Sequence, residues 1–118
     1  MRFDSSVQLS GRTALADTEV VGVPIAKGAR LVCYPGAANR DPQRFDDPIR
    51  HDLARREGAP LSFGGGIHYC LGAPLARLEA QLAFPALLTR YSNLQPSDGA
   101  QRRDSLTLCG YLRLPMNC

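Results

Sequence analysis

Two short apolar runs in the first third of the chain have the character of β-strands. Residues 20–23 are rich in β-branched side chains, and residues 31–34 form a second apolar run. Pro24 and the Lys27-Gly28 pair lie between the runs and indicate a turn. The pattern predicts that residues 20–23 and 31–34 are paired strands.

A longer periodic segment lies in the second half of the chain. Leucines recur three or four residues apart and would share one helical face, at Leu71, Leu75, Leu78 and Leu82. Pro74 suits the first turn of a helix, whereas Pro85 predicts a kink or an end nearby. Because Leu87 and Leu88 continue the apolar pattern, we expect one helix over residues 73–90.

The other segments carry little periodicity. Residues 1–10 are the tail of a helix or lead into a strand. Residues 37–61 are rich in Pro, Asp and Arg, and a long irregular stretch of this kind is usually functional or disordered. We expect an ordered coil there, held by salt bridges and by three apolar anchors, Phe45, Ile49 and Leu53. Residues 106–108 and 111–114 predict a terminal β-hairpin.

Composition and charge narrow the function. The 118 residues suit one small domain, and 44% of them are hydrophobic, as in a globular protein. A net charge of +3 with scattered arginines gives no basic stripe for nucleic acid. No apolar stretch is long enough to span a membrane, and the N-terminus has no apolar signal region. We expect a cytoplasmic protein with no nucleic-acid or membrane partner.

The four cysteines do not share one explanation. They stand at positions 33, 70, 109 and 118, with no C-x-x-C pair of the structural zinc kind. Without a secretory signal, a disulfide framework is not expected. Only Cys70 has distinctive surroundings, so Cys33, Cys109 and Cys118 are assigned no role.

Cys70 lies in the glycine-rich segment 62–72, SFGGGIHYCLG. Its spacing fits neither the phosphate-binding P-loop nor the dinucleotide-binding pattern. A thiol on such a loop, just before a helix N-terminus, is favoured as the thiolate, which is a nucleophile or a metal ligand. As a nucleophile it would use His68 as base, in a hydrolase that lacks a third group to orient the histidine. As a haem ligand it would need glycines that let the flat ring approach the backbone.

The same loop resembles the haem-binding signature of the cytochrome P450 family, F-x-x-G-x-[HR]-x-C-x-G. The five defined positions are filled at the right spacing, by Phe63, Gly66, His68, Cys70 and Gly72. Other segments resemble further parts of the family's fold. Residues 38–42 and 45–48 are similar to its irregular meander, and residues 10–14 to the strand that reaches the haem edge. Residues 2–5 are similar to the residues after its E-x-x-R motif, and residues 73–79 to the helix after the cysteine.

The resemblance implies an α+β fragment, the C-terminal part of the mainly-α cytochrome P450 fold. Its short strands, meander coil, cysteine loop, long helix and terminal β-hairpin would fill the chain in five segments. These are 1–36 (end of a helix and β region), 37–61 (meander), 62–72 (cysteine loop), 73–90 (helix) and 91–118 (terminal β region).

The resemblance also assigns roles around a haem b cofactor. Cys70 would be the axial thiolate of the iron, and His68 and Arg12 would hydrogen-bond a haem propionate. Phe63 would pack beside the thiolate and limit water access. The two signature glycines, Gly66 and Gly72, would allow the backbone conformation and its close approach to the ring.

A structural cluster is implied as well. Arg2 and Arg50 would belong to the family's Glu-Arg-Arg cluster, which holds the meander under the haem. His51 stands where the family has phenylalanine, and this removes an aromatic anchor. Arg77 would lie on the face that receives an electron donor, although a solvated arginine is the more ordinary reading.

The resemblance implies that the protein would be a haem-thiolate monooxygenase. It would take electrons from a ferredoxin-type donor and insert oxygen into a small organic substrate. No segment resembles the distal helix with its acid–alcohol pair, and the glutamate partner of Arg2 would precede residue 1. We therefore expect a truncated chain with little turnover alone, and the alternative is a non-enzymatic haem-binding remnant or a pseudogene-like fragment.

Overall fold

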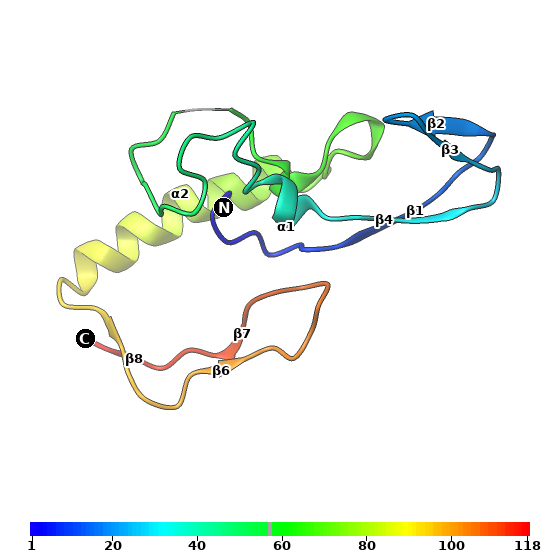
Figure 1. Cartoon of the computed structure of the whole chain (residues 1–118). Helices are drawn as coiled ribbons and strands as arrows, with labels where there is room; N and C mark the ends of the chain where they lie inside the picture. Colours follow the sequence, from blue (N-terminus) through cyan, green and yellow to red (C-terminus); the bar gives the residue numbers. More distant parts are fainter. Residues whose placement is uncertain (57) are drawn as a thin grey trace. The chain divides into compact units, whose positions relative to one another are not determined.

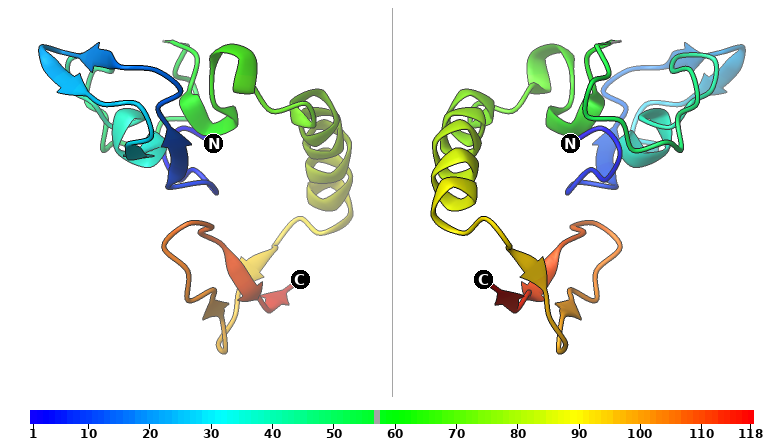
Figure 2. Two further views of the ribbon diagram at one scale, coloured as in Figure 1. Left: turned by 90° about the vertical axis from the view of Figure 1, so that its right-hand side faces the viewer. Right: turned by 90° about the vertical axis from the view of Figure 1, so that its left-hand side faces the viewer.

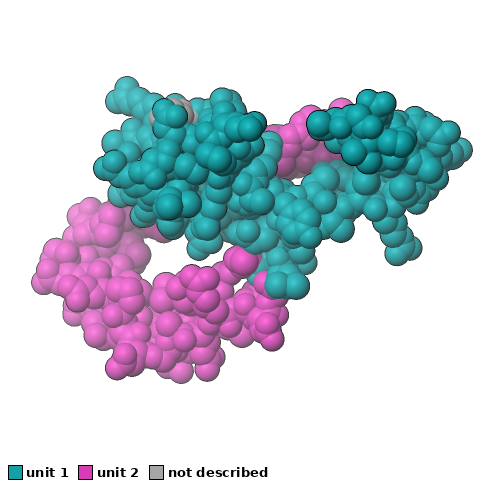
Figure 3. Space-filling view, in the orientation of Figure 1, with its two compact units in different colours: residues 1–62, 106–108 teal, residues 63–105, 109–118 magenta. Residues whose placement is uncertain are grey.

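The computed structural model describes residues 1–56 and 58–118 and divides the chain into two compact units (Figure 3). Unit 1 comprises residues 1–62 and 106–108, and unit 2 comprises residues 63–105 and 109–118. Short strands and one long helix make up these units, so the predicted α+β class is confirmed. The division into five segments stays a prediction.

Unit 1 contains a long antiparallel β-hairpin, drawn from blue to cyan in Figure 1. Strand β1 (Ser10–Thr13) pairs with β4 (Arg30–Cys33), and β2 (Thr18–Val20) pairs with β3 (Val23–Ile25). The two pairs share one register, and the backbone hydrogen bond from Ala14 N–H to the Ala29 carbonyl continues the ladder between them.

The predicted pairing of residues 20–23 with 31–34 is wrong, because the chain reverses earlier than expected. The turn lies at Val21 and Gly22, whose φ angles are 50° and 77°. A tight two-residue hairpin turn of this kind needs positive φ at both positions. Lys27 and Gly28 do form a turn, closed by the hydrogen bond from Ala29 N–H to the Ala26 carbonyl at 3.0 Å, but it lies within the returning limb and does not reverse the hairpin.

The rest of unit 1 is irregular chain built around a buried asparagine. Asn39 follows the short helix α1 (Pro35–Ala38) and is fully buried. Its side-chain oxygen accepts from Leu61 N–H at 2.7 Å, and its amide donates to the hydroxyl of Ser62 at 3.2 Å. Since buried polar groups are costly unless they are paired, this network orders two segments of coil together.

Arginine side chains hold the coil 37–61 through backbone carbonyls, a bonding mode that the salt-bridge prediction did not include. Arg40 donates to the Phe3 carbonyl at 2.7 Å, and Arg55 donates to the Asp46 carbonyl at 2.6 Å. A guanidinium has five N–H donors, so it can serve the unpaired carbonyls of irregular backbone.

Only one of the three predicted apolar anchors of this coil is buried. Phe45 is 3% exposed, as expected. Ile49 and Leu53 are 74% and 91% exposed, so their assignment as anchors is wrong. The N-terminal segment contains no helix in its ten described residues, and Val7 forms an isolated bridge with Leu108.

Unit 2 contains the predicted helix. Two short 3-10 turns, η1 (Leu61–Phe63, which begins in unit 1) and η2 (Gly66–His68), precede α2 (Ala73–Arg90). Pro74 occupies the first turn of α2, and Figure 2 shows α2 as one continuous helix, although Pro85 lies inside it. Within the described residues, no helix is long and apolar enough to cross a membrane.

Two small strand pairs complete unit 2. Strand β5 (Gln95–Pro96) pairs with β8 (Met116–Asn117), and β6 (Gln101–Arg102) pairs with β7 (Tyr111–Arg113). The predicted hairpin between 106–108 and 111–114 is therefore wrong. Gly110 does not take the positive φ of a tight turn, whereas Gly99, between β5 and β6, has φ 88°.

Candidate functional site

The glycine-rich loop that carries Cys70 is closed by its own backbone. Cys70 N–H donates to the Phe63 carbonyl at 2.9 Å, and Tyr69 N–H donates to the Gly66 carbonyl at 3.1 Å. Gly64 and Gly66 have φ angles of 76° and 62°, in the left-handed region that residues with a Cβ rarely adopt. The spacing of these glycines thus determines the path of the loop.

The thiol lies at the entrance to α2. The Cys70 carbonyl accepts from Ala73 N–H at 3.2 Å, which links the loop to the first residue of the helix. Cys70 is a free, exposed cysteine. A Cβ built on Gly72 would lie 3.8 Å from Cys70 Sγ, so the glycine keeps open the space beside the sulfur. The loop therefore presents one accessible thiol to an incoming ligand.

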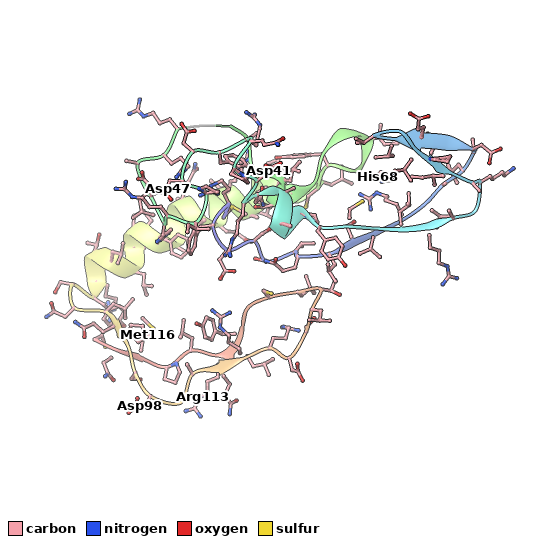
Figure 4. The ribbon with its side chains drawn as sticks, viewed as in Figure 1. Asp41, Asp47, His68, Asp98, Arg113 and Met116 are labelled. Carbon is pink, nitrogen blue, oxygen red and sulfur yellow. The ribbon has the colours of Figure 1, made fainter. Side chains whose placement is uncertain are left out.

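Aromatic contacts surround the start of this loop. Phe63 is half-buried, and its ring makes an edge contact with Tyr69 at a centroid distance of 6.3 Å. The guanidinium carbon of Arg77, on α2, lies 5.4 Å from the centroid of the same ring. His68 ends η2 with an exposed side chain (Figure 4). The predicted residues 63, 66, 68, 70 and 72 thus share one short loop of unit 2.

Arg12 belongs to the other unit, in strand β1. Its guanidinium donates to the hydroxyl of Ser10 at 2.6 Å and to the Gly11 carbonyl at 2.8 Å. These partners are its immediate neighbours along the strand, and the side chain is exposed. Its role as a propionate donor stays a prediction.

Arg2 joins the N-terminal segment to the coil of unit 1. It donates to the Asn39 carbonyl at 2.6 Å and to the Pro48 carbonyl at 3.0 Å, and it lies 4.9 Å from the centroid of the Phe45 ring. It also approaches the Arg50 carbonyl at 3.5 Å. The structure therefore brings Arg2 to the backbone of Arg50, while the predicted three-residue cluster stays a prediction.

His51, which stands where the family has phenylalanine, is exposed and makes a ring contact. The imidazole of His51 packs against the ring of Phe3, with 5.0 Å between the ring centroids. The guanidinium carbon of Arg40 lies 5.1 Å from the centroid of the same phenylalanine. An imidazole is flat and partly apolar, so it can make a ring contact at a position where the family has phenylalanine.

The sequence analysis did not anticipate the role of Asn39 or the contact between Arg77 and Phe63. Asn39 lies in the meander-like motif, which is the only signal that could have drawn attention to it. Arg77 and Phe63 are fourteen positions apart in the printed sequence, and no pattern connects them.

Among the described residues, no group of three His, Cys, Asp or Glu side chains is placed to hold a metal ion.

The sequence of this chain is similar to proteins of one known family, cytochrome P450. The family model for cytochrome P450 matches residues 1–116. Cytochrome P450 CYP199A2 of Rhodopseudomonas palustris is 38% identical over 116 residues, which cover 98% of this chain and 28% of that protein. The biotin biosynthesis cytochrome P450 of Bacillus subtilis is 44% identical over 98 residues, which cover 83% of this chain and 25% of that protein.

Solved structures agree in fold as well as in sequence. The crystal structure of CYP164A2 from Mycobacterium smegmatis with econazole bound matches 100% of this chain and 30% of its own, at a TM-score of 0.93 and 40% identity. The chain spans less than a third of the length of the curated relatives and solved structures named here.

Proposed function

The chain belongs to the cytochrome P450 family, and we propose that it forms the haem-binding part of a haem-thiolate monooxygenase, with Cys70 as the axial ligand of the iron. The family implies a haem cofactor, and haem b is the form proposed here. The observation that carries the proposal is the exposed thiol of Cys70 on its glycine loop at the entrance to α2.

The residues of the loop suit such a group. Cysteine is the protein ligand of iron in haem-thiolate proteins, and Cys70 presents an accessible sulfur. A Cβ built on Gly66 would meet nothing within 4 Å, so the loop keeps open space there. Gly72 leaves room beside the sulfur. A flat macrocycle needs this combination of one sulfur ligand and backbone without side chains.

Each proposed role follows from the chemistry of the side chain. Cys70 would donate electron density through its thiolate, and His68 and Arg12 would hold carboxylate groups of the cofactor by charge-assisted hydrogen bonds. Phe63 would exclude water from the sulfur. Bound haem would supply activation of O₂, with insertion of one oxygen atom into an organic substrate.

The remaining parts of the proposal concern partners and the structural cluster. Arg2, which holds carbonyls of the coil, and Arg50 would keep the meander in place. A ferredoxin-type protein would supply electrons, and the substrate would be a small organic molecule. Because no segment of these 118 residues resembles the distal helix of the family, we expect the chain alone to show little turnover.

The test is the absorption spectrum of the purified chain after reconstitution with haem, reduction and exposure to carbon monoxide. We expect a strongly red-shifted Soret band that is lost in Cys70→Ala. Cys33→Ala is the matched control, because Cys33 is also free and exposed but lies in β4. The band should survive in this variant.

Two outcomes would overturn the assignment. A band that persists in Cys70→Ala would show that another residue ligates the iron. Haem uptake without any red-shifted band in the unaltered chain would show that the thiolate site does not form, and would favour the non-enzymatic haem-binding remnant.

A further inference from the structure

Phe63 is the point at which three contacts of the cysteine loop meet. Its backbone carbonyl accepts the hydrogen bond from Cys70 N–H at 2.9 Å. Its ring contacts Tyr69, the neighbour of Cys70, at a centroid distance of 6.3 Å. A contact that holds Phe63 in place therefore also holds the backbone of Cys70, the proposed haem ligand.

Arg77 supplies a further contact to Phe63, from the helix that follows the loop. Its guanidinium carbon lies 5.4 Å from the centroid of the Phe63 ring, within the range of a cation–π interaction. Phe63 begins the loop and Arg77 lies in the second turn of α2. The contact thus ties the start of the loop to the helix beyond its end.

We propose that Arg77 is a positioning residue for Cys70: it clamps the Phe63 ring and so holds the carbonyl that accepts the Cys70 hydrogen bond. The consequence for haem ligation rests on the function proposed above. The effect of Arg77 on the order of the loop does not rest on that function, because every contact that supports it lies within unit 2 and involves no cofactor.

The first test is hydrogen exchange of the Cys70 amide in the cofactor-free chain. An exposed cation–π contact corresponds to about a two- to fivefold change in an equilibrium, so Arg77→Ala should speed this exchange by about that factor. Alanine is at least as good a helix former as arginine, so α2 itself should not weaken. Arg77→Lys should restore most of the protection, because an ammonium also binds the face of a ring.

The chain offers a matched control at the other end of α2. The guanidinium carbon of Arg90 lies 5.6 Å from the centroid of the Tyr91 ring, a contact of the same kind away from the loop. Arg90→Ala should leave the exchange of the Cys70 amide unchanged. Phe63→Leu keeps the backbone carbonyl but removes the ring, so Arg77→Ala should have no further effect in that background.

Three results would overturn the proposal: unchanged Cys70 exchange in Arg77→Ala, faster exchange spread evenly along α2, or an Arg77→Ala effect that persists with Phe63→Leu.

The haem-loaded chain gives the second readout. There, Arg77→Ala should lower by about two- to fivefold the ratio of thiolate-ligated to other haem in the carbon monoxide spectrum, and an unchanged ratio would contradict the proposed consequence. If the unaltered chain shows no such band, the proposed function fails while the exchange result still decides the role of Arg77.

Discussion

At the scale of single residues, Val21 has the least suitable backbone for its side chain. Its φ of 50° lies in the left-handed region, and its side chain is 97% exposed at the tip of the first hairpin. A β-branched residue is disfavoured there by about 1–2 kcal/mol relative to ordinary backbone. The side chain gains little packing in return, so the turn carries a local cost.

Val21→Asn should therefore stabilise the protein by about 1 kcal/mol. Asparagine followed by glycine is a preferred pair for a two-residue hairpin turn, and Gly22 already follows with φ 77°. The free energy of unfolding from urea titration would measure the effect. Val23→Asn, in strand β3, is the control and should lower stability, because asparagine is disfavoured in strands. A loss of stability in Val21→Asn would contradict the prediction.

At the scale of elements, α2 shows that a helix can continue through a local breaker. The leucine spacing predicted residues 73–90, and the helix spans Ala73–Arg90. Pro85 removes one backbone donor inside the helix and crowds the carbonyl four residues earlier. The helix nevertheless continues for five residues beyond it.

Pro85→Ala should stabilise α2 by up to about 3 kcal/mol, the difference between the two residues in a helix interior. Thermal unfolding followed by circular dichroism would measure this. Pro74→Ala provides the comparison, because a proline in the first turn lacks an N–H that would have no partner within the helix. Equal effects of the two substitutions would show that Pro85 is not under strain.

Turns are the elements that the sequence pattern predicted least well. The first hairpin reverses at Val21-Gly22, although Lys27-Gly28 is the more typical turn pair. At the end of the chain, β7 pairs with β6 and not with residues 106–108. Glycine marks where a turn is possible, but the choice among glycines depends on which strands pair along their length.

At the scale of the whole molecule, the described chain buries few large apolar side chains. Phe45 is the one large apolar side chain among the buried residues of the described chain; Ala14 and Ala73 are also buried. Three leucines of the α2 stripe, Leu75, Leu78 and Leu82, are between 51% and 66% exposed. Exposed leucines at this helical spacing promote association.

Replacing these three leucines with glutamine should reduce self-association of the isolated chain several-fold, because it removes apolar surface without weakening the helix. Glutamine is close to leucine in helix propensity, so circular dichroism should stay the same. Sedimentation velocity over a range of concentrations would measure the association. An unchanged association constant would show that this face is not responsible.

The sequence by itself determined the features that depend on residues close together along the chain. The glycine and cysteine spacing of residues 63–72 identified the family resemblance, and the leucine period predicted α2, because local backbone geometry and helix periodicity are written in neighbouring residues. The tertiary structure decided what depends on distant residues. Four contacts join segments that no sequence periodicity connects. They are the carbonyls bound by Arg2, the buried network of Asn39, the contact of His51 with Phe3 and the contact of Arg77 with the Phe63 ring. Such contacts arise only when the folded backbone brings polar and aromatic groups within a few ångströms of each other.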